Sequence, residues 1–281
     1  MKITINDYGN QTEFMVVNNN GKQFCFASAQ FYQDSSWVVS ISSQKGCPMS
    51  CTFCDVPLFG FQGNASIENL TNQLEIMLKH FSSIKSTNHF YVHYARMGEP
   101  TFNNNVLEFT TKNLTPLVNS YLKTNSIHPV VLTMLPNNNS QLKQFLQNWT
   151  NIKNSVYNGK AGLQFSINST DNKQRNQMFN NKSLSLEQIS ELSDHLPNPV
   201  GSKYTLSFVL TKDTIIDPNK LDQLFDKNKF LIKIAPVHET KSTIKNNLNL
   251  LDSQTSYKIC KQIETQLLEH GWEVIVFTIP K

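Results

Sequence analysis

The stretch that decides the fold is Trp37-Val38-Val39-Ser40-Ile41-Ser42-Ser43-Gln44-Lys45-Gly46-Cys47-Pro48-Met49-Ser50-Cys51-Thr52-Phe53-Cys54. Its first part, Trp37–Ser42, is rich in valine and isoleucine and predicts a buried strand. Its second part holds three of the five cysteines of the 281-residue chain, Cys47, Cys51 and Cys54. A cysteine loop directly after a strand predicts chemistry at the carboxyl end of that strand.

Six further strand candidates follow, and helical patterns separate them. They are Phe90–Tyr94, Pro129–Met134, Gly162–Asn168, Tyr204–Leu210, Leu231–Pro236 and Glu273–Phe277. Several are almost continuously apolar, which is typical of parallel strands covered on both faces. Apolar residues at helical spacing occupy residues 67–81 and 259–268. The alternation predicts an α/β fold, a partial (β/α)6-type parallel barrel with right-handed crossovers, with a doubly wound open sheet as the alternative.

The segment before the first barrel strand predicts a small β extension. Lys2 to Ser28 reads as two short strands around the turn Asn18-Asn19-Asn20-Gly21, since Asn-Gly is a strong hairpin signal. We therefore expect residues 1–36 to form the extension and residues 37–281 to form the barrel domain.

Composition restricts the class of protein. The net charge is +4 and the basic residues are scattered singly, which does not indicate a nucleic-acid patch. No apolar run approaches the roughly 18 residues of a membrane span, and the first residues lack a signal-peptide core. An odd number of cysteines, with three in eight residues, favours metal binding in a reducing compartment over disulfides. We expect a cytoplasmic protein without membrane attachment.

The spacing of the cysteines, C-x3-C-x2-C, favours an iron–sulfur cluster. Thiolates are the usual ligands of a [4Fe–4S] cubane, and three cysteines leave one iron open. An open iron can chelate S-adenosylmethionine (SAM), whose reductive cleavage yields a 5′-deoxyadenosyl radical; Phe53 is placed to shield the cluster. Half of a zinc knuckle and buried structural thiols are the alternatives, but no second cysteine pair follows.

A second motif, Gly98-Glu99-Pro100, follows the second predicted strand. Alone it predicts only a turn with a solvated carboxylate. After a cysteine loop, at the end of the next barrel strand, it predicts a contact to the amino group of SAM.

With both motifs, the chain resembles the radical SAM adenine methyltransferases of ribosomal and transfer RNA, the RlmN/Cfr family. The matching stretches are VSISSQKGCPMSCTFCDVPLFGF, MGEPTFN, VVLTMLP, LQFSINSTDNKQR and the region from Leu231 through Trp272-Glu273-Val274. The resemblance covers most of residues 20–279. It implies a [4Fe–4S] cluster and SAM as cofactors, a flavodoxin- or ferredoxin-type reductant, and RNA as a possible substrate.

Carried over by position, the resemblance also implies SAM-binding residues. Thr133 stands where the family has a serine, Asn168 where it has a histidine, and His238 where it has an asparagine. The implied positions are Gly98, Glu99, Thr133, Ser166, Asn168 and His238. Without the resemblance, the pattern would indicate only ordinary polar residues at strand ends or in loops for Thr133, Ser166, Asn168 and His238.

The chain departs from the family at the methyl-transfer half of the site. The family's methyl-carrying cysteine lies beyond the last strand, and the residues to Lys281 hold none. Its second mechanistic cysteine lies seven residues before the cluster, where this chain has Ser40. The family's glutamate base has no counterpart in Lys22–Phe26, and its N-terminal RNA-binding domain has none before residue 37. Serine is a poor methyl acceptor, so we expect no methylcysteine chemistry.

Three hypotheses remain. The leading one is an enzyme that cleaves SAM reductively and abstracts hydrogen from an unidentified substrate. The others are an RNA modification enzyme and a non-catalytic iron–sulfur or SAM-binding protein. Residues predicted to face the substrate are His93, Tyr94, Arg96 and Arg175, and no catalytic residue is identified. Of the remaining cysteines, Cys260 reads as a buried structural thiol and Cys25 as a thiol near the barrel mouth.

Overall fold

The computed structural model describes residues 3–17, 21–32 and 35–277. Ten strands in these ranges form one sheet, in the order β1-β2-β3-β4-β7-β8-β9-β10-β11-β12. Their bounds are β1 (Ile3–Asp7), β2 (Gln11–Val17), β3 (Gln23–Phe31), β4 (Ser36–Ile41), β7 (Ser86–Tyr94), β8 (Lys123–Thr133), β9 (Gly162–Ser166), β10 (Tyr204–Leu210), β11 (Phe230–Pro236) and β12 (Val274–Val276). From β4 to β12 all neighbours are parallel, as predicted for a partial barrel.

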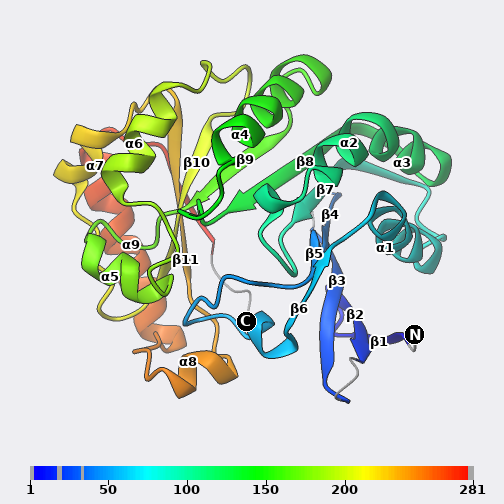
Figure 1. The fold of residues 1–281 in the computed structure, drawn as a ribbon, viewed down its shortest axis with the longest axis horizontal. Coiled ribbons are helices and arrows are strands. Elements are labelled where there is room, and N and C mark those ends of the chain that lie inside the picture. Colours follow the sequence, from blue (N-terminus) through cyan, green and yellow to red (C-terminus); the bar gives the residue numbers. More distant parts are fainter. Residues whose placement is uncertain (1–2, 18–20, 33–34, 278–281) are drawn as a thin grey trace.

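Helices connect the parallel strands and surround the sheet on its outer side (Figure 1). The α-helices are α1 (Ile67–His80), α2 (Asn105–Glu108), α3 (Thr115–Tyr121), α4 (Leu142–Asn151), α5 (Asn172–Met178), α6 (Leu186–Asp194), α7 (Pro218–Leu224), α8 (Lys241–Lys245) and α9 (Ser253–Glu269). Short 3-10 turns form η1 (Val56–Phe59) and η2 (Pro100–Phe102), and π-helical segments form η3 (Phe109–Leu114) and η4 (Ile152–Val156). No helix among the described residues has the length and apolar character of a membrane span.

The first barrel helix, α1, shows why these elements form where they do. Ser66 caps it by accepting from the Asn69 backbone N–H, and the Asn69 side chain accepts from Ser66 in return, a capping box. Leu70, Leu74 and Met77 then fall on one face and are fully buried against the sheet. A cap of this kind stabilises a helix by about 1 kcal/mol, so most of the stability of α1 comes from the buried face.

The two faces of the parallel sheet differ in chemistry. On β4, Trp37, Val39 and Ile41 are buried in the apolar core beneath the helices. The residues between them point to the other face, which we call the concave face. On β7 the concave residues are His89, Tyr91 and His93, whereas Phe90, Val92 and Tyr94 join the core. The prediction that Tyr94 faces the substrate is therefore wrong. Side chains alternate along the strand, and Tyr94 lies on the face under the helices, where its hydroxyl contacts Thr110 Oγ1 at 2.6 Å.

The N-terminal extension is larger than the two strands predicted. β1 and β2 form an antiparallel pair, β2 pairs with β3, and β3 pairs with β4, so the extension continues the main sheet. The predicted Asn18–Asn20 part of the turn between β2 and β3 lies outside the described residues. The additional strand, β1, is mostly exposed, and its weak apolar pattern explains why the sequence did not reveal it.

The parallel strands agree with the sequence prediction in position and differ at their ends. β10 has the predicted bounds, and β8 begins six residues earlier than Pro129, at Lys123. β9 ends at Ser166 and not at Asn168 as predicted, because Asn168 has a φ of 63°. That left-handed conformation cannot continue a strand, and asparagine is among the few residues that adopt it readily.

Candidate cofactor site

The three cysteines of the loop lie close together at the carboxyl end of β4. Cys47, Cys51 and Cys54 are all half-buried, and none forms a disulfide. Burial raises the pKa of Cys47 to about 12 and that of Cys51 well above its usual value, and the charges of neighbouring cysteines add to both shifts. The thiols are therefore protonated when no metal is bound, and a metal would displace the protons.

The three thiols are the donor type that an iron–sulfur cubane uses. Among the described residues, no group of three or more His, Cys, Asp and Glu side chains is found that could hold a single metal ion. In a cubane each cysteine binds a different iron, so the thiols need only surround a shared space.

The cysteine loop is fixed by residues that are distant in sequence. The Thr52 N–H donates to the Met178 carbonyl at 2.9 Å, and Lys182 Nζ donates to the Pro48 carbonyl at 2.7 Å. Asn246 donates its side-chain amide to the Thr52 carbonyl at 2.8 Å. These bonds connect the loop to the segment after β9 and to α8, beside which Figure 1 shows the blue loop passing.

Asp55, directly after the last cysteine, caps α8. Its two carboxylate oxygens accept from the backbone N–H groups of Lys241 at 3.1 Å and Ser242 at 2.7 Å. Burial raises the pKa of Asp55, but the hydrogen bonds from Ser242 and Lys241 outweigh it and hold the pKa below its usual value. The end of the cysteine loop is thus held to α8 by a carboxylate that is charged at neutral pH.

Apolar side chains cover the inner side of the cysteine loop. Met49, Met134 and Phe179 are nearly fully buried and form a small separate cluster against which Cys47, Cys51 and Phe53 pack. The Phe53 and Phe179 rings meet edge to face at 5.9 Å, and Cys51 Sγ lies 3.7 Å from Met134 Sδ. Phe53 therefore lies where a shielding residue should lie, and such cover would keep water from a cluster.

The Gly98-Glu99 turn meets the cysteine loop at the end of β7. Gly98 has a φ of 99°, and a Cβ added there would lie 2.5 Å from the Cβ of Gln44, so only glycine fits. Gln44 Oε1 accepts from the Glu99 N–H at 2.9 Å, and a backbone hydrogen bond from Gly98 reaches Cys47. The two predicted motifs are therefore in direct contact.

The Glu99 carboxyl group is 3% exposed and has no cationic partner among the described residues. Oε2 accepts from the Met134 N–H at 3.0 Å, and Oε1 accepts from the N–H and the hydroxyl of Thr101 at 3.2 and 2.8 Å. Burial raises the pKa of Glu99, and the hydrogen bonds from Met134, Thr133 and Thr101 oppose that rise. Carboxylate oxygens have further lone pairs, so the group retains acceptor capacity for a cation.

Arg175 is the second buried charge at this site, and it is 0% exposed. Its guanidinium donates to the carbonyls of Ser166 at 2.7 Å, Leu184 at 3.1 Å and Met134 at 3.4 Å, and it lies 4.7 Å from the centre of the Phe179 ring. It also donates to the Ile167 carbonyl and to the Ser183 hydroxyl. The prediction that Arg175 faces a substrate is wrong, since carbonyls at the ends of β8 and β9 enclose it.

The charge of Arg175 has no carboxylate partner among the described residues. Burial lowers its pKa to about 9, and a thiolate at Cys51 would oppose that shift. Sequence reasoning missed this role; the only signal was an arginine shortly after the strand that ends at Ser166. Glu99 and Arg175 thus bracket Met134, one bonded to its N–H and the other to its carbonyl.

The remaining predicted SAM-binding residues lie at strand ends, in differing surroundings. Thr133 is buried, and its hydroxyl accepts from the Leu135 N–H at 2.9 Å and supports Glu99. Asn168 is buried, and its side-chain oxygen accepts from the Val209 N–H at 3.2 Å, which ties β9 to β10. Ser166 is half-buried, and His238 is exposed just after β11. A SAM contact from each of these four remains a prediction.

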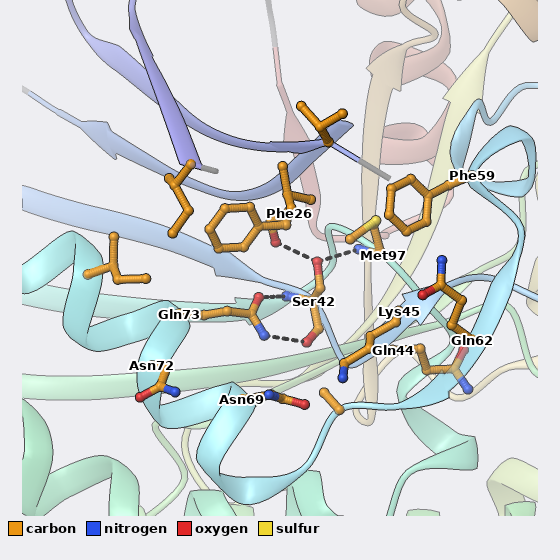
Figure 2. A pocket seen from close by; sticks show the side chains of 15 residues that line it. Phe26, Ser42, Gln44, Lys45, Phe59, Gln62, Asn69, Asn72, Gln73 and Met97 are labelled. Carbon is orange, nitrogen blue, oxygen red and sulfur yellow. Dashed lines mark hydrogen bonds between the residues drawn. The ribbon is translucent and has the colours of Figure 1, made fainter. Parts of the chain in front are cut away.

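A cavity of about 590 Å³ lies behind the Gly98-Glu99 turn, between α1 and the N-terminal extension (Figure 2). Ser42 forms its centre: Gln73 pairs with the Ser42 backbone at 2.7 and 3.0 Å, and the Ser42 hydroxyl accepts from the Met97 N–H at 3.1 Å. The cavity therefore lies on the helix side of the sheet, and the residues that line it also support the cofactor turn.

The other two cysteines lie outside this loop. Cys260 is 1% exposed in the core beneath α9, as predicted for a structural thiol. Cys25 lies on β3 near Arg96 and Glu13, and burial raises its pKa to about 11.

Comparison with known proteins agrees with these observations. No protein-family model matches the chain. A probable dual-specificity RNA methyltransferase RlmN of Thermotoga petrophila is 26% identical over 224 residues, which are 78% of this chain and 60% of the relative. The RlmN of Petrotoga mobilis is 27% identical over 213 residues, which are 74% of this chain and 56% of the relative. The chain thus spans about three fifths of the length of these relatives.

Solved structures show the same fold. A radical SAM methyltransferase from Sphaerobacter thermophilus superposes with a TM-score of 0.69 at 15% identity, covering 99% of this chain and 78% of that one. SuiB of Streptococcus suis, solved with S-adenosylmethionine, superposes with a TM-score of 0.53 at 12% identity and covers 88% of this chain and 50% of its own. In sequence the chain is similar to RlmN proteins, and its fold is similar to those of the radical SAM methyltransferase and of SuiB.

Proposed function

We propose that the chain is a radical SAM enzyme that cleaves SAM reductively and takes a hydrogen atom from its substrate. The observation that carries this is the meeting of the three loop cysteines with a buried carboxyl group, Glu99, and a buried guanidinium, Arg175, around Met134. Radical SAM chemistry needs a place for an anionic cluster and a place for a cationic ligand side by side. A [4Fe–4S] cluster and SAM therefore fit the residues present.

Cys47, Cys51 and Cys54 would bind three irons, leaving the fourth open to the amino and carboxylate groups of SAM. A reduced cluster bound there would supply the electron that breaks a C–S bond of SAM, and the 5′-deoxyadenosyl radical so released would take a hydrogen atom from the substrate. The protein positions both groups and excludes water. Reduction calls for a partner of the flavodoxin or ferredoxin type.

Glu99 is the residue that would bind the ammonium of SAM. Its carboxylate is held rigidly by the Met134 and Thr101 N–H groups, so it needs no reorganisation when the cation arrives. Desolvation strengthens such a pair, because the charges attract more strongly outside water. Gly98 brings this turn against Cys47, so an ammonium bound by Glu99 would lie next to the cysteine loop.

Arg175 is the residue that would balance the charge of the cluster. A cubane with three thiolates is anionic, and its reduction adds a further negative charge. A fully buried guanidinium without a carboxylate partner is costly unless an anion lies nearby, and Cys51, as a thiolate ligand of the cluster, would be that anion. Arg175 would therefore stabilise the reduced cluster and raise its potential.

The proposed reaction does not pass through a methylated cysteine. Ser40, which stands at the position of the family's second mechanistic cysteine, lies on β4 opposite His93 and half-buried on the concave face. Burial raises the pKa of Cys25, the thiol of the N-terminal extension, to about 11, so it is protonated at neutral pH. A protonated thiol is a poor nucleophile, so neither residue accepts a methyl group readily.

A labelled cofactor tests this proposal. Reconstituted enzyme is given dithionite and SAM with a trideuterated methyl group, and the protein is then weighed intact. We expect 5′-deoxyadenosine in solution and no increase in protein mass. A deuterated methyl group on any cysteine of the chain would overturn the second half of the proposal and leave the first intact.

RNA modification is the second candidate, because the relatives that match the chain bear the name RNA methyltransferase. The test is binding of ribosomal and transfer RNA fragments by the cluster-loaded protein at low and high salt. RNA recognition predicts an affinity that falls steeply with salt, because phosphate contacts release counterions. The absence of binding to every fragment at low salt would reject it.

A further inference from the structure

The concave face of the sheet, below the cofactor site, carries a row of polar residues. Strand register places Glu13 beside Ser28, Ser28 beside Ser40, and Ser40 beside His93. A second row crosses the opposite side of the barrel. There Ser166 pairs with Ser207, and Ser207 pairs with Lys233. These two rows lie on the concave face, which we take as the face where a substrate would bind.

The positive charge of Arg96 on this face is balanced by a carboxylate. Arg96, just after β7, lies 3.7 Å from the Glu13 carboxylate and donates from Nε to the Ser28 hydroxyl at 2.8 Å. Both side chains of the pair are mostly buried, so the positive charge of Arg96 is balanced within the wall itself.

Lys233, on the same face, carries a positive charge that no carboxylate among the described residues balances. Its neighbours on β11, Ile232 and Ile234, are 0% exposed beneath the helices, so Lys233 points to the concave face. Its ammonium lies 5.2 Å from the centre of the Phe277 ring, and among residues 3–17, 21–32 and 35–277 no acidic side chain contributes to its electrostatics. Burial lowers its pKa, as it does for any cation without a partner.

His93 faces Lys233 across the interior and does not balance it. Burial, and after it the nearby charge of Lys233, lower the pKa of His93 to about 3. The imidazole is therefore neutral near pH 7. It offers one hydrogen-bond donor and one acceptor, but no negative charge.

We propose that Lys233 binds an anionic oxygen group of the substrate, a phosphate or a carboxylate, inside the barrel beneath the cofactor site. The inference rests on the proposed function only in taking the concave interior as the place of the substrate. A half-buried ammonium gains from a counter-ion, because its charge is poorly screened there. The hydroxyls of Ser207 and Ser166 lie in the same row, and each can donate a hydrogen bond to an oxyanion.

The flanking contacts position the ammonium for such a ligand. Phe277 holds the cation by its ring face and, unlike a carboxylate, does not neutralise it. A lysine binds phosphate or carboxylate as a point charge, whereas arginine binds through a planar fork. Substitution by arginine should therefore retain part of the affinity, and substitution by glutamine should remove it.

Binding to oxidised, cluster-loaded protein tests this without any radical chemistry. The probes are inorganic phosphate, succinate, adenosine 5′-monophosphate and a short single-stranded RNA, with adenosine as the uncharged reference. We expect at least one anionic probe to bind, and Lys233→Gln to weaken it by about tenfold or more, the effect of losing a charged hydrogen bond. Lys233→Arg should lie between the two.

The matched control is Lys143→Gln, which removes the same charge from an exposed position on α4. It should leave every affinity unchanged. The proposal is overturned if Lys233→Gln binds all probes as the control does, or if no anionic probe binds better than adenosine. The pattern of binding also identifies the molecule that carries the anionic group. Binding of the mononucleotide indicates a small metabolite, and binding of RNA alone indicates a polymer.

Failure of this proposal is distinguishable from failure of the proposed function. Cleavage of SAM in the absence of substrate depends on the cofactor site and not on Lys233. Release of 5′-deoxyadenosine should therefore be the same for Lys233→Gln and for the wild-type protein, whatever the binding experiment shows.

Discussion

The cofactor site and the concave interior below it are built in different ways. At the cofactor site, the charged groups Asp55, Glu99 and Arg175 accept or donate several internal hydrogen bonds each, to backbone atoms above all. In the interior, Lys233 has an aromatic ring and no counter-ion among the described residues. The difference indicates that the cofactor site is preorganised for ligands of fixed charge. On the concave face, by contrast, the charge of Lys233 is left for a group of the substrate to balance.

The largest effect is expected from removing a cluster ligand. Cys51→Ala should leave the protein unable to hold an intact [4Fe–4S] cluster, because Cys51 is one of only three thiols in the loop. Iron and sulfide content after reconstitution, with the visible absorption of the cluster, measures this. Cys260→Ala, a buried thiol outside the loop, is the control and should retain the cluster. Equal iron content in the two variants would contradict the assignment.

The next effect separates SAM binding from cluster binding. Glu99→Gln keeps the size of the side chain and removes its charge, so the ammonium of SAM loses its partner. We expect SAM to bind about ten to a hundred times more weakly, a loss of 1.4 to 2.8 kcal/mol, with the iron content unchanged. Titration of SAM followed by the electron paramagnetic resonance of the reduced cluster measures it. Unchanged affinity would place the ammonium elsewhere.

Arg175 gives a smaller effect on the potential of the cluster. Arg175→Gln removes a buried positive charge, so reduction becomes harder and the midpoint potential should fall by on the order of tens of millivolts. Arg175→Lys keeps the charge but loses part of the hydrogen bonding, and it separates charge from structure. A purely structural role predicts that both variants lose stability alike and that neither shifts the potential. Spectroscopic redox titration distinguishes these outcomes.

The smallest effect concerns Asp55 and acid pH. Its folded pKa lies below its unfolded pKa, so its contribution to stability is present above the unfolded value. The contribution is lost as the pH falls through the folded pKa. Asp55→Asn should therefore reduce stability modestly at neutral pH and converge with the wild type in acid. Thermal unfolding between about pH 7 and pH 3 measures this; a constant difference across that range would contradict it.

The sequence predicted the cofactor site better than the interior, for a physical reason. The cysteine spacing and the Gly98-Glu99 turn are local signals, because consecutive residues must form one loop. The fold follows from apolar runs, and the strands from Trp37 to Pro236 were located by them. Strand ends were less predictable: Asn168 ended β9 through a backbone angle that no apolar pattern encodes.

Long-range pairing explains what the sequence did not reveal. Arg175 meets the carbonyls of two strands and the charge of Cys51 only after the chain has folded. The direction of the Tyr94 side chain follows from the alternation along β7, which places it on the same face as Phe90 and Val92. Likewise Lys233 and His93 come from strands 140 residues apart and face each other only in the barrel.

Release of 5′-deoxyadenosine is the measurement that tests the central claim most directly. Wild-type protein with a reconstituted cluster is reduced with dithionite and incubated with SAM, and the nucleoside is quantified by liquid chromatography and mass spectrometry. The account predicts 5′-deoxyadenosine in proportion to the cluster content, and none from Cys51→Ala. A spectroscopically intact cluster that binds SAM and yields no 5′-deoxyadenosine would contradict it.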